Sequence, residues 1–151
     1  MRKSFLAAGT ALALGGIAFS ALAQVKPEVL VKQRQAAMTL QGKYFGPLGG
    51  MAQGKVPYDA QVVQRNAGYL DVLTKLPWDG FDPSTKDQKS QALPEVYSDQ
   101  AKFKEASERL QSEVAKLVQV SKSGDENAVK GQIGAVGKSC GGCHDTFRQK
   151  Q

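Results

Sequence analysis

Both cysteines and the only histidine of this 151-residue chain lie in one stretch near the C-terminus, Ser139-Cys140-Gly141-Gly142-Cys143-His144-Asp145. A Cys-x-x-Cys-His run is the attachment signature of c-type haem: the two thiols add across the porphyrin vinyl groups, and the adjacent imidazole ligates the iron. On a helix, Cys140, Cys143 and His144 stand at positions i, i+3 and i+4 and project from one face. The stretch therefore predicts a helix that carries one covalently attached haem c.

Three other interpretations of this stretch are weaker. A thioredoxin-like dithiol needs a strand that leads into a helix, and no β-rich run precedes Cys140. A zinc site takes four ligands, and two thiols with one imidazole leave it short. A disulfide across two intervening residues of a helix is geometrically awkward. The intact signature favours covalent haem.

Residues 1–23 have the features of a secretory signal peptide. A start with two basic residues precedes the apolar stretch 5–19, and residues 21–23, Ala-Leu-Ala, fit the small-x-small cleavage rule. The apolar stretch is too short and too rich in Ala and Gly for a membrane anchor. We expect export to the periplasm, no membrane insertion and a mature domain that spans residues 24–151.

The charge is mildly basic, with 20 Lys and Arg residues against 14 Asp and Glu residues, a formal net charge of +6. The basic residues are scattered among the acidic ones, so the sequence predicts no nucleic-acid patch. A solvated exterior is the simplest interpretation, and an acidic redox partner protein is the alternative. Both thiols belong to the haem signature, which leaves no cysteine pair for a structural disulfide.

Two stretches of helical period fill the first half of the mature chain. The first opens at Pro27 and repeats apolar residues at heptad spacing, namely Val31, Met38 and Phe45. Gly46-Pro47 is expected to end or loosen it. Asp59 is the expected N-cap of the second helix, which ends before Pro77.

Two more helical stretches fill the second half. Ser98 is the expected cap of the third, which Gly124 ends, and Asp125 is the expected cap of the fourth. The fourth places its apolar residues and both cysteines on one seam, made of Val129, Ile133, Val136, Cys140, Cys143 and Phe147. The haem should therefore lie inside the bundle.

Two further features surround the expected cofactor. Gly134, Gly137 and Gly141 share a face of the fourth helix, and we expect them to let a neighbouring helix or the porphyrin approach closely. The apolar residues of the connection 77–97 follow no regular period, and a loop of that length usually covers a functional site. Trp78 and Phe81 are the apolar anchors that would hold it over a cofactor edge.

Four helices with short links except one, and a cofactor site on the last helix, describe an all-α antiparallel four-helix bundle. At this point the sequence resembles the cytochromes c′, the class II c-type cytochromes. The position of the signature at the far end, together with Arg34-Gln35 and Pro77-Trp78, points to this family among the c-type cytochromes. The matching residues are Lys26-Pro27-Glu28, Arg34-Gln35, Thr39-Leu40, Phe45-Gly46, Pro57-Tyr58-Asp59-Ala60, Leu76-Pro77-Trp78, Pro94-Glu95, Ser98-Asp99 and Cys140 to Arg148.

The resemblance implies roles for individual residues. His144 would be the proximal axial ligand, with Cys140 and Cys143 as the thioether anchors. Arg34 and Gln35 look like the residues that contact the propionate side of the haem. Arg148 resembles the proximal-pocket arginine of the family, and Gln91 looks like a further haem contact.

The sixth coordination position of the iron decides the function. Because His144 is the only histidine, two imidazoles from one chain cannot both ligate the iron, and the sixth ligand is Met, Lys, water or nothing. Met51 follows Gly49-Gly50 in an expected turn and is the weaker methionine candidate. Met38 should face the distal side of the haem, where three roles stay open: apolar packing over an open iron site, ligation of the iron, and ordinary core packing.

The resemblance and the apolar distal pocket predict a periplasmic haem protein with a five-coordinate iron that binds NO and CO and sequesters NO. The alternative is a low-spin electron carrier in which Met38 is the sixth ligand. An enzyme is not expected, because a peroxidase needs a distal acid–base residue and the chain has no second histidine. The resemblance also implies a homodimer through the first two helices, and an apolar side with Leu30, Ala37 and Tyr44 permits it.

Overall fold

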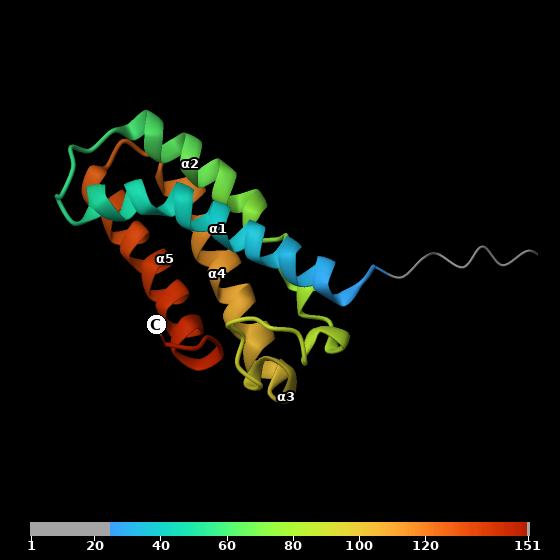
Figure 1. The fold of residues 1–151 in the computed structure, drawn as a ribbon. Coiled ribbons are helices and arrows are strands. Elements are labelled where there is room, and N and C mark those ends of the chain that lie inside the picture. Colours follow the sequence, from blue (N-terminus) through green and yellow to red (C-terminus); the bar gives the residue numbers. More distant parts are fainter. Residues whose placement is uncertain (1–24, 151) are drawn as a thin grey trace, which may run out of the picture.

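The computed structural model describes residues 25–150, so the predicted signal peptide, residues 1–23, lies outside the described residues. Four long helices form the bundle: α1 (Pro27–Ala52), α2 (Ala60–Leu73), α4 (Gln100–Val120) and α5 (Glu126–Phe147). In Figure 1, α1 and α2 run side by side, and α4 and α5 form the second pair. The predicted all-α antiparallel four-helix bundle is confirmed.

The connection between α2 and α4 contains short helical turns that its sequence does not predict. They are the 3-10 turns η1 (Trp78–Phe81) and η2 (Pro83–Thr85) and the single-turn helix α3 (Glu95–Ser98). The two 3-10 turns pack against α1, and α3 packs against α4 and α5. This connection therefore bridges both helix pairs at one end of the bundle (Figure 1).

Carboxylates cap three of the long helices. Asp59 Oδ1 accepts hydrogen bonds from the Gln61 and Val62 amides at 2.9 and 3.0 Å, and Asp125 caps α5 in the same way. Both caps were predicted. The prediction that Ser98 caps the third helix is wrong, because Asp99 accepts from the Lys102 amide and Ser98 ends α3. A carboxylate adds a favourable interaction with the helix dipole to the hydrogen bond.

The predicted ends of two helices are also wrong. α1 continues through Pro47 to Ala52, because Leu48 and Met51 beyond the proline are buried in the core and offset its missing hydrogen bond. Met51 therefore lies in a helix and not in a turn. α4 ends at Val120, and Gly124, with φ of 78°, lies in the turn that joins α4 to α5.

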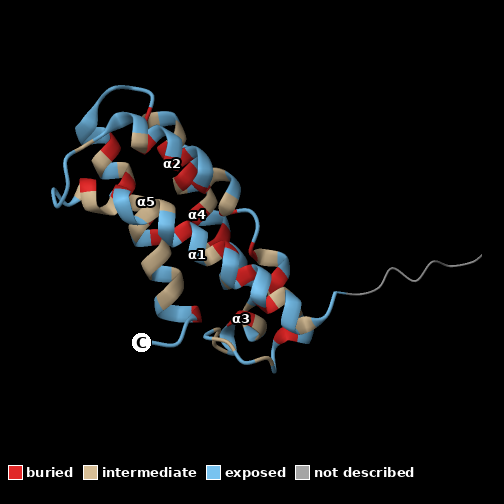
Figure 2. Ribbon diagram, turned by 45° about the horizontal axis from the view of Figure 1, so that its top comes forward, coloured by how far each residue is buried: buried red, intermediate tan, exposed pale blue. Residues whose placement is uncertain are grey.

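The core lies between the four long helices, and Figure 2 marks buried positions on each of them. The predicted seam of α5 is buried at Val129, Ile133, Val136 and Phe147, while Cys140 and Cys143 are half-buried. On α1, Ala37 is buried and Leu30 and Tyr44 are half-buried. Of the apolar side that was predicted to permit a homodimer, Ala37 is therefore covered by the protein itself.

The glycines of α5 differ in their surroundings. A Cβ on Gly137 would lie 3.3 Å from the Phe45 ring, so this glycine does let α1 approach α5 closely. Gly134 is exposed and would meet no atom within 4 Å, so the prediction fails there. Gly141 has no protein neighbour within 4 Å of such a Cβ either. Within residues 25–150, no helix has the length and apolar character that a membrane span requires.

Candidate haem-binding site

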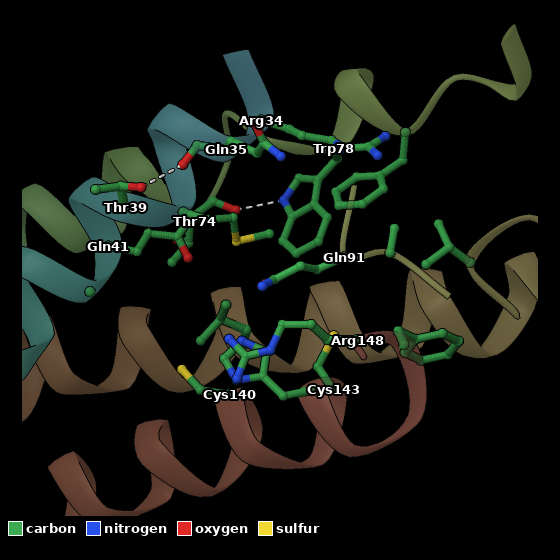
Figure 3. A pocket seen from close by; sticks show the side chains of 18 of the residues that line it. Arg34, Gln35, Thr39, Gln41, Thr74, Trp78, Gln91, Cys140, Cys143 and Arg148 are labelled. Carbon is green, nitrogen blue, oxygen red and sulfur yellow. Dashed lines mark hydrogen bonds between the residues drawn. The ribbon is translucent and has the colours of Figure 1, made fainter. Parts of the chain in front are cut away.

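A cavity of about 670 Å³ opens between α1, α5 and the α2–α4 connection. Its walls include every residue that the sequence analysis assigned to the cofactor: Arg34, Gln35, Met38, Trp78, Gln91, Cys140, Cys143, His144 and Arg148. Figure 3 shows α1 above the cavity and the cysteines of α5 below it. The bundle thus brings residues more than 100 positions apart in the sequence to opposite walls of one space.

The α5 wall holds the two thiols and the imidazole. Burial, with a smaller contribution from Cys143, raises the pKa of Cys140 to about 11. Burial also raises the pKa of Cys143. Burial lowers the pKa of His144; the positive charge of Arg148 lowers it further, and the negative charge of Asp145 opposes this shift. At neutral pH the imidazole is therefore uncharged, and its free ring nitrogen can bind a metal.

The α1 wall is formed by one stripe of the helix. Met38 is half-buried in this wall, and Phe45 lies two turns further along it. The hydroxyl of Thr39 donates to the Gln35 carbonyl at 2.9 Å, so it is turned back onto its own helix. Met51 does not line the cavity and belongs to the hydrophobic core. Met38 is thus the methionine that faces this space among the described residues.

Arg34 is a buried cation that ties α1 to the α2–α4 connection. Its side chain is 3% exposed, and its guanidinium packs 4.3 Å from the centroid of the Phe81 ring. The guanidinium donates to four acceptors of the connection: the Gly80 carbonyl at 2.6 Å, Thr85 Oγ1 at 2.9 Å, Ser90 Oγ at 3.0 Å and Tyr97 Oη at 3.2 Å. These hydrogen bonds satisfy a buried charge and fix the connection against α1.

Gly80 makes this arrangement possible. A Cβ at this position would lie 2.7 Å from Arg34 Cβ and 2.8 Å from the Leu30 carbonyl oxygen, distances that no side chain tolerates. The sequence analysis identified Arg34 but not its partners. An arginine within the buried stripe of α1 signals that acceptors must surround it, but their positions depend on how the connection folds back.

Trp78 and Phe81 line the cavity as part of an aromatic cluster. The indole Nε1 of Trp78 donates to the Thr74 carbonyl at 2.6 Å. The rings of Trp78 and Phe81 pack on Phe103 of α4, which in turn packs on Phe147 of α5. The cluster therefore joins the connection to both C-terminal helices beside the cavity.

Gln91 and Arg148 lie at the exposed rim because the C-terminal residues pair with the connection. The Leu93 amide donates to the Phe147 carbonyl and the Gln149 amide donates to the Gln91 carbonyl, both at 2.9 Å. Ala92 and Arg148 form an isolated antiparallel bridge between these segments. The side chains of Gln91 and Arg148 are both exposed and line the cavity.

The residues of this cavity fit a c-type haem. Two thiols and an uncharged imidazole share one wall, the space is mainly apolar, and its volume is of the size that cofactor sites have, about 300–1,000 Å³. The family model described as cytochrome C′ matches residues 29–148. This chain belongs to the cytochrome c′ family. Its cofactor is haem c, attached through Cys140 and Cys143.

Known cytochromes c′ resemble the chain over most of its length. The protein from Rubrivivax gelatinosus is 41% identical over 126 residues, which cover 83% of this chain and 98% of the relative. The structure from Shewanella frigidimarina has a TM-score of 0.80 at 34% identity and covers 84% of this chain and 99% of the other. A nitric oxide complex of an Alcaligenes xylosoxidans variant has a TM-score of 0.76 at 39% identity, with 83% and 98% coverage. Another variant of that cytochrome c′ has been solved with carbon monoxide bound.

Proposed function

We propose that this cytochrome c′ is a periplasmic haem protein whose iron is held by His144, stays open on the Met38 side and binds NO and CO. The observation that carries the proposal is the asymmetry of the two cavity walls. The α5 wall presents an imidazole, and the α1 wall presents the thioether of Met38 and the ring of Phe45. When bound, haem supplies an iron that coordinates diatomic gases.

The α1 wall favours NO and CO over O₂. A bound O₂ is stabilised by a hydrogen-bond donor, and this wall is apolar at Met38 and Phe45. The Thr39 hydroxyl is engaged by its own helix, the Gln41 amide donates to the Leu73 carbonyl, and Nη1 and Nη2 of Arg34 are engaged by the connection. The NO and CO complexes of the Alcaligenes xylosoxidans relative support the same ligand class for this chain. The cellular role that follows is sequestration of NO.

The remaining site residues act around the cofactor. Arg34 has five N–H donors, and its hydrogen bonds to the connection run from Nη1 and Nη2 only, which leaves Nε for a propionate beside Gln35. Trp78 packs over the cofactor edge, and Gln91 contacts it at the rim. Arg148 places a positive charge beside His144, where it stabilises negative charge on the proximal side.

Export and assembly complete the proposal. Residues 1–23 are removed as a signal peptide, and the domain 24–151 acts in the periplasm. The chain forms a homodimer through α1 and α2, whose exposed large apolar residues are Val29, Leu40, Tyr69 and Val72, with Leu76 just beyond α2. Apolar groups of this size on two packed helices favour association. A sedimentation experiment on the holoprotein and on a Val72→Glu variant tests the dimer.

A low-spin electron carrier is the second candidate, and Met38 is the observation that favours it. Its thioether is a soft ligand on the wall opposite His144. Absorption spectra of the ferric and ferrous holoprotein, with and without CO and NO, separate the two functions. A high-spin spectrum that shifts with both gases supports the open iron site. A low-spin spectrum that CO leaves unchanged overturns it and makes Met38 the sixth ligand.

A further inference from the structure

The mouth of the cavity runs along one edge of α1. Three residues of this helix both line the cavity and are exposed to solvent: Gln35, Thr39 and Gly42. They stand at positions i, i+4 and i+7 and therefore follow one stripe of the helix surface. Figure 3 shows Gln35 and Thr39 above the cavity, on the side away from the cysteines. The solvent thus reaches the cavity on the wall that carries Met38.

The backbone leaves a gap at Gly42, one turn beyond Met38. A Cβ on Gly42 would meet no other side chain and no neighbouring element within 4 Å among the described residues. Thr39, on the other side of the gap, is short, and its hydroxyl bonds to its own helix. By contrast, the ring of Phe45, three residues further along, packs against Gly137 of α5 and closes the space there.

We propose that Gly42 determines how fast ligands reach the Met38 side of the cavity, and the inference rests on the proposed gas-binding function. The missing side chain keeps the mouth open for small uncharged molecules. A glycine within an exposed helix costs stability relative to other residues, and this one makes no close packing contact and adopts no left-handed backbone. Keeping the mouth of the cavity open is a role that requires a residue without a side chain at position 42.

Gly46 provides a matched control. It lies one turn beyond Gly42 on the same helix, is also exposed and has no neighbouring element within 4 Å of a Cβ. It differs in that it does not line the cavity. Leucine at position 42 favours the helix, so Gly42→Leu should fold with a raised thermal unfolding midpoint. Gly46 precedes Pro47 inside α1, where a side chain crowds the proline ring, so Gly46→Leu is the control for the CO kinetics and not for the midpoint.

Flash photolysis of the ferrous CO complex tests the inference. Gly42→Leu should slow CO association about tenfold, the effect of a barrier of ~1.4 kcal/mol, while Gly46→Leu stays close to wild type. Because a molecule leaves by the route it enters, CO dissociation should slow by the same factor, and the equilibrium affinity should not change. Gly42→Ala should fall between wild type and Gly42→Leu.

The outcomes separate the inference from the function on which it rests. An unchanged CO association rate in Gly42→Leu overturns the role of Gly42. A slower association rate with a CO affinity that falls by the same factor also overturns it, because the leucine then destabilises the bound state and does not only obstruct the route. A similar slowing in Gly46→Leu overturns it as well. A wild-type protein that does not bind CO at all contradicts the gas-binding function itself.

Discussion

At the scale of single residues, Met38 is the side chain that separates the two proposed functions. It is half-buried in the wall opposite His144. If it packs over an open iron site, Met38→Ala removes the group that a ligand must displace, and CO association should rise about tenfold or more, a barrier change of ~1.4 kcal/mol. Stopped-flow mixing of the ferrous protein with CO measures this rate.

Met51 supplies the control for that variant. It is a second methionine of α1, buried in the core and away from the cavity. Met51→Leu should leave both the absorption spectrum and the CO rate unchanged, because a volume-conserving core substitution affects stability alone. A Met38→Ala protein whose ferric spectrum changes from low-spin to high-spin would show that Met38 is a ligand.

Gly80 gives a residue-scale prediction about stability. Gly80→Ala should lower the free energy of unfolding by about 1–3 kcal/mol, because the methyl group would be forced against Arg34 and the Leu30 carbonyl. Guanidinium chloride unfolding followed by haem absorbance measures the change. Gly131→Ala is the matched variant: its methyl group meets no atom within 4 Å, and it should stabilise α5 by up to about 1 kcal/mol.

The sequence predicts the site residues that carry a chemical signature, but not those whose role is to hold Arg34 in place. The spacing of Cys140, Cys143 and His144 predicts haem attachment, and the heptad pattern of α1 predicts the position of Met38. Gly80 and Tyr97 have no such signature. Their importance arises from the position of Arg34 across the fold, which depends on long-range packing that a local pattern does not encode.

At the scale of elements, α4 and α5 are joined by a polar clamp. The Gln132 side chain donates to the backbone carbonyl and the carboxylate of Glu113, at 2.9 and 2.7 Å. Glu113 also accepts a hydrogen bond from Lys116. These hydrogen bonds, that from Lys116 first, lower the pKa of the Glu113 carboxyl. The clamp is therefore strongest when the carboxyl is ionised.

The clamp predicts a pH dependence of stability. Because the folded-state pKa of Glu113 lies below its unfolded value, its contribution is complete above the ordinary carboxyl range and is lost as the pH falls through the folded-state pKa. Glu113→Gln should therefore lower the denaturation midpoint at pH 7, and the difference from wild type should shrink at pH 3. Glu108→Gln, an exposed change on the same helix, should show a smaller difference at both pH values.

Helix starts are easier to predict than helix ends in this chain. Asp59 and Asp125 are recognised as caps because a short acidic side chain precedes a periodic stretch. The end of α1 is missed because local signals at Gly46-Pro47 oppose the tertiary burial of Leu48 and Met51, and burial is the larger effect. The cap of α4 is missed by one residue, because Ser98 ends α3 and the Asp99 carboxylate accepts from the Lys102 amide.

At the scale of the whole molecule, the cavity predicts that folding depends on the cofactor. A mainly apolar space of about 670 Å³ between α1, α5 and the connection leaves much apolar surface without packing partners when the cofactor is absent, which lowers stability. A Cys140→Ala, Cys143→Ala double variant, made without haem, should show much weaker helical circular dichroism than the holoprotein. Full helicity in the haem-free chain would contradict this prediction.

The backbone pairing between the C-terminal residues and the α2–α4 connection has a consequence for the order of assembly. The Leu93 and Gln149 amides bond to carbonyls more than fifty residues away in the sequence. The wall beside Gln91 is therefore completed by residues 147–149, at and just beyond the end of the haem-bearing helix. Until they arrive, the haem-bearing helix is open on that side, and a cofactor can be delivered to its cysteines before the pocket is sealed.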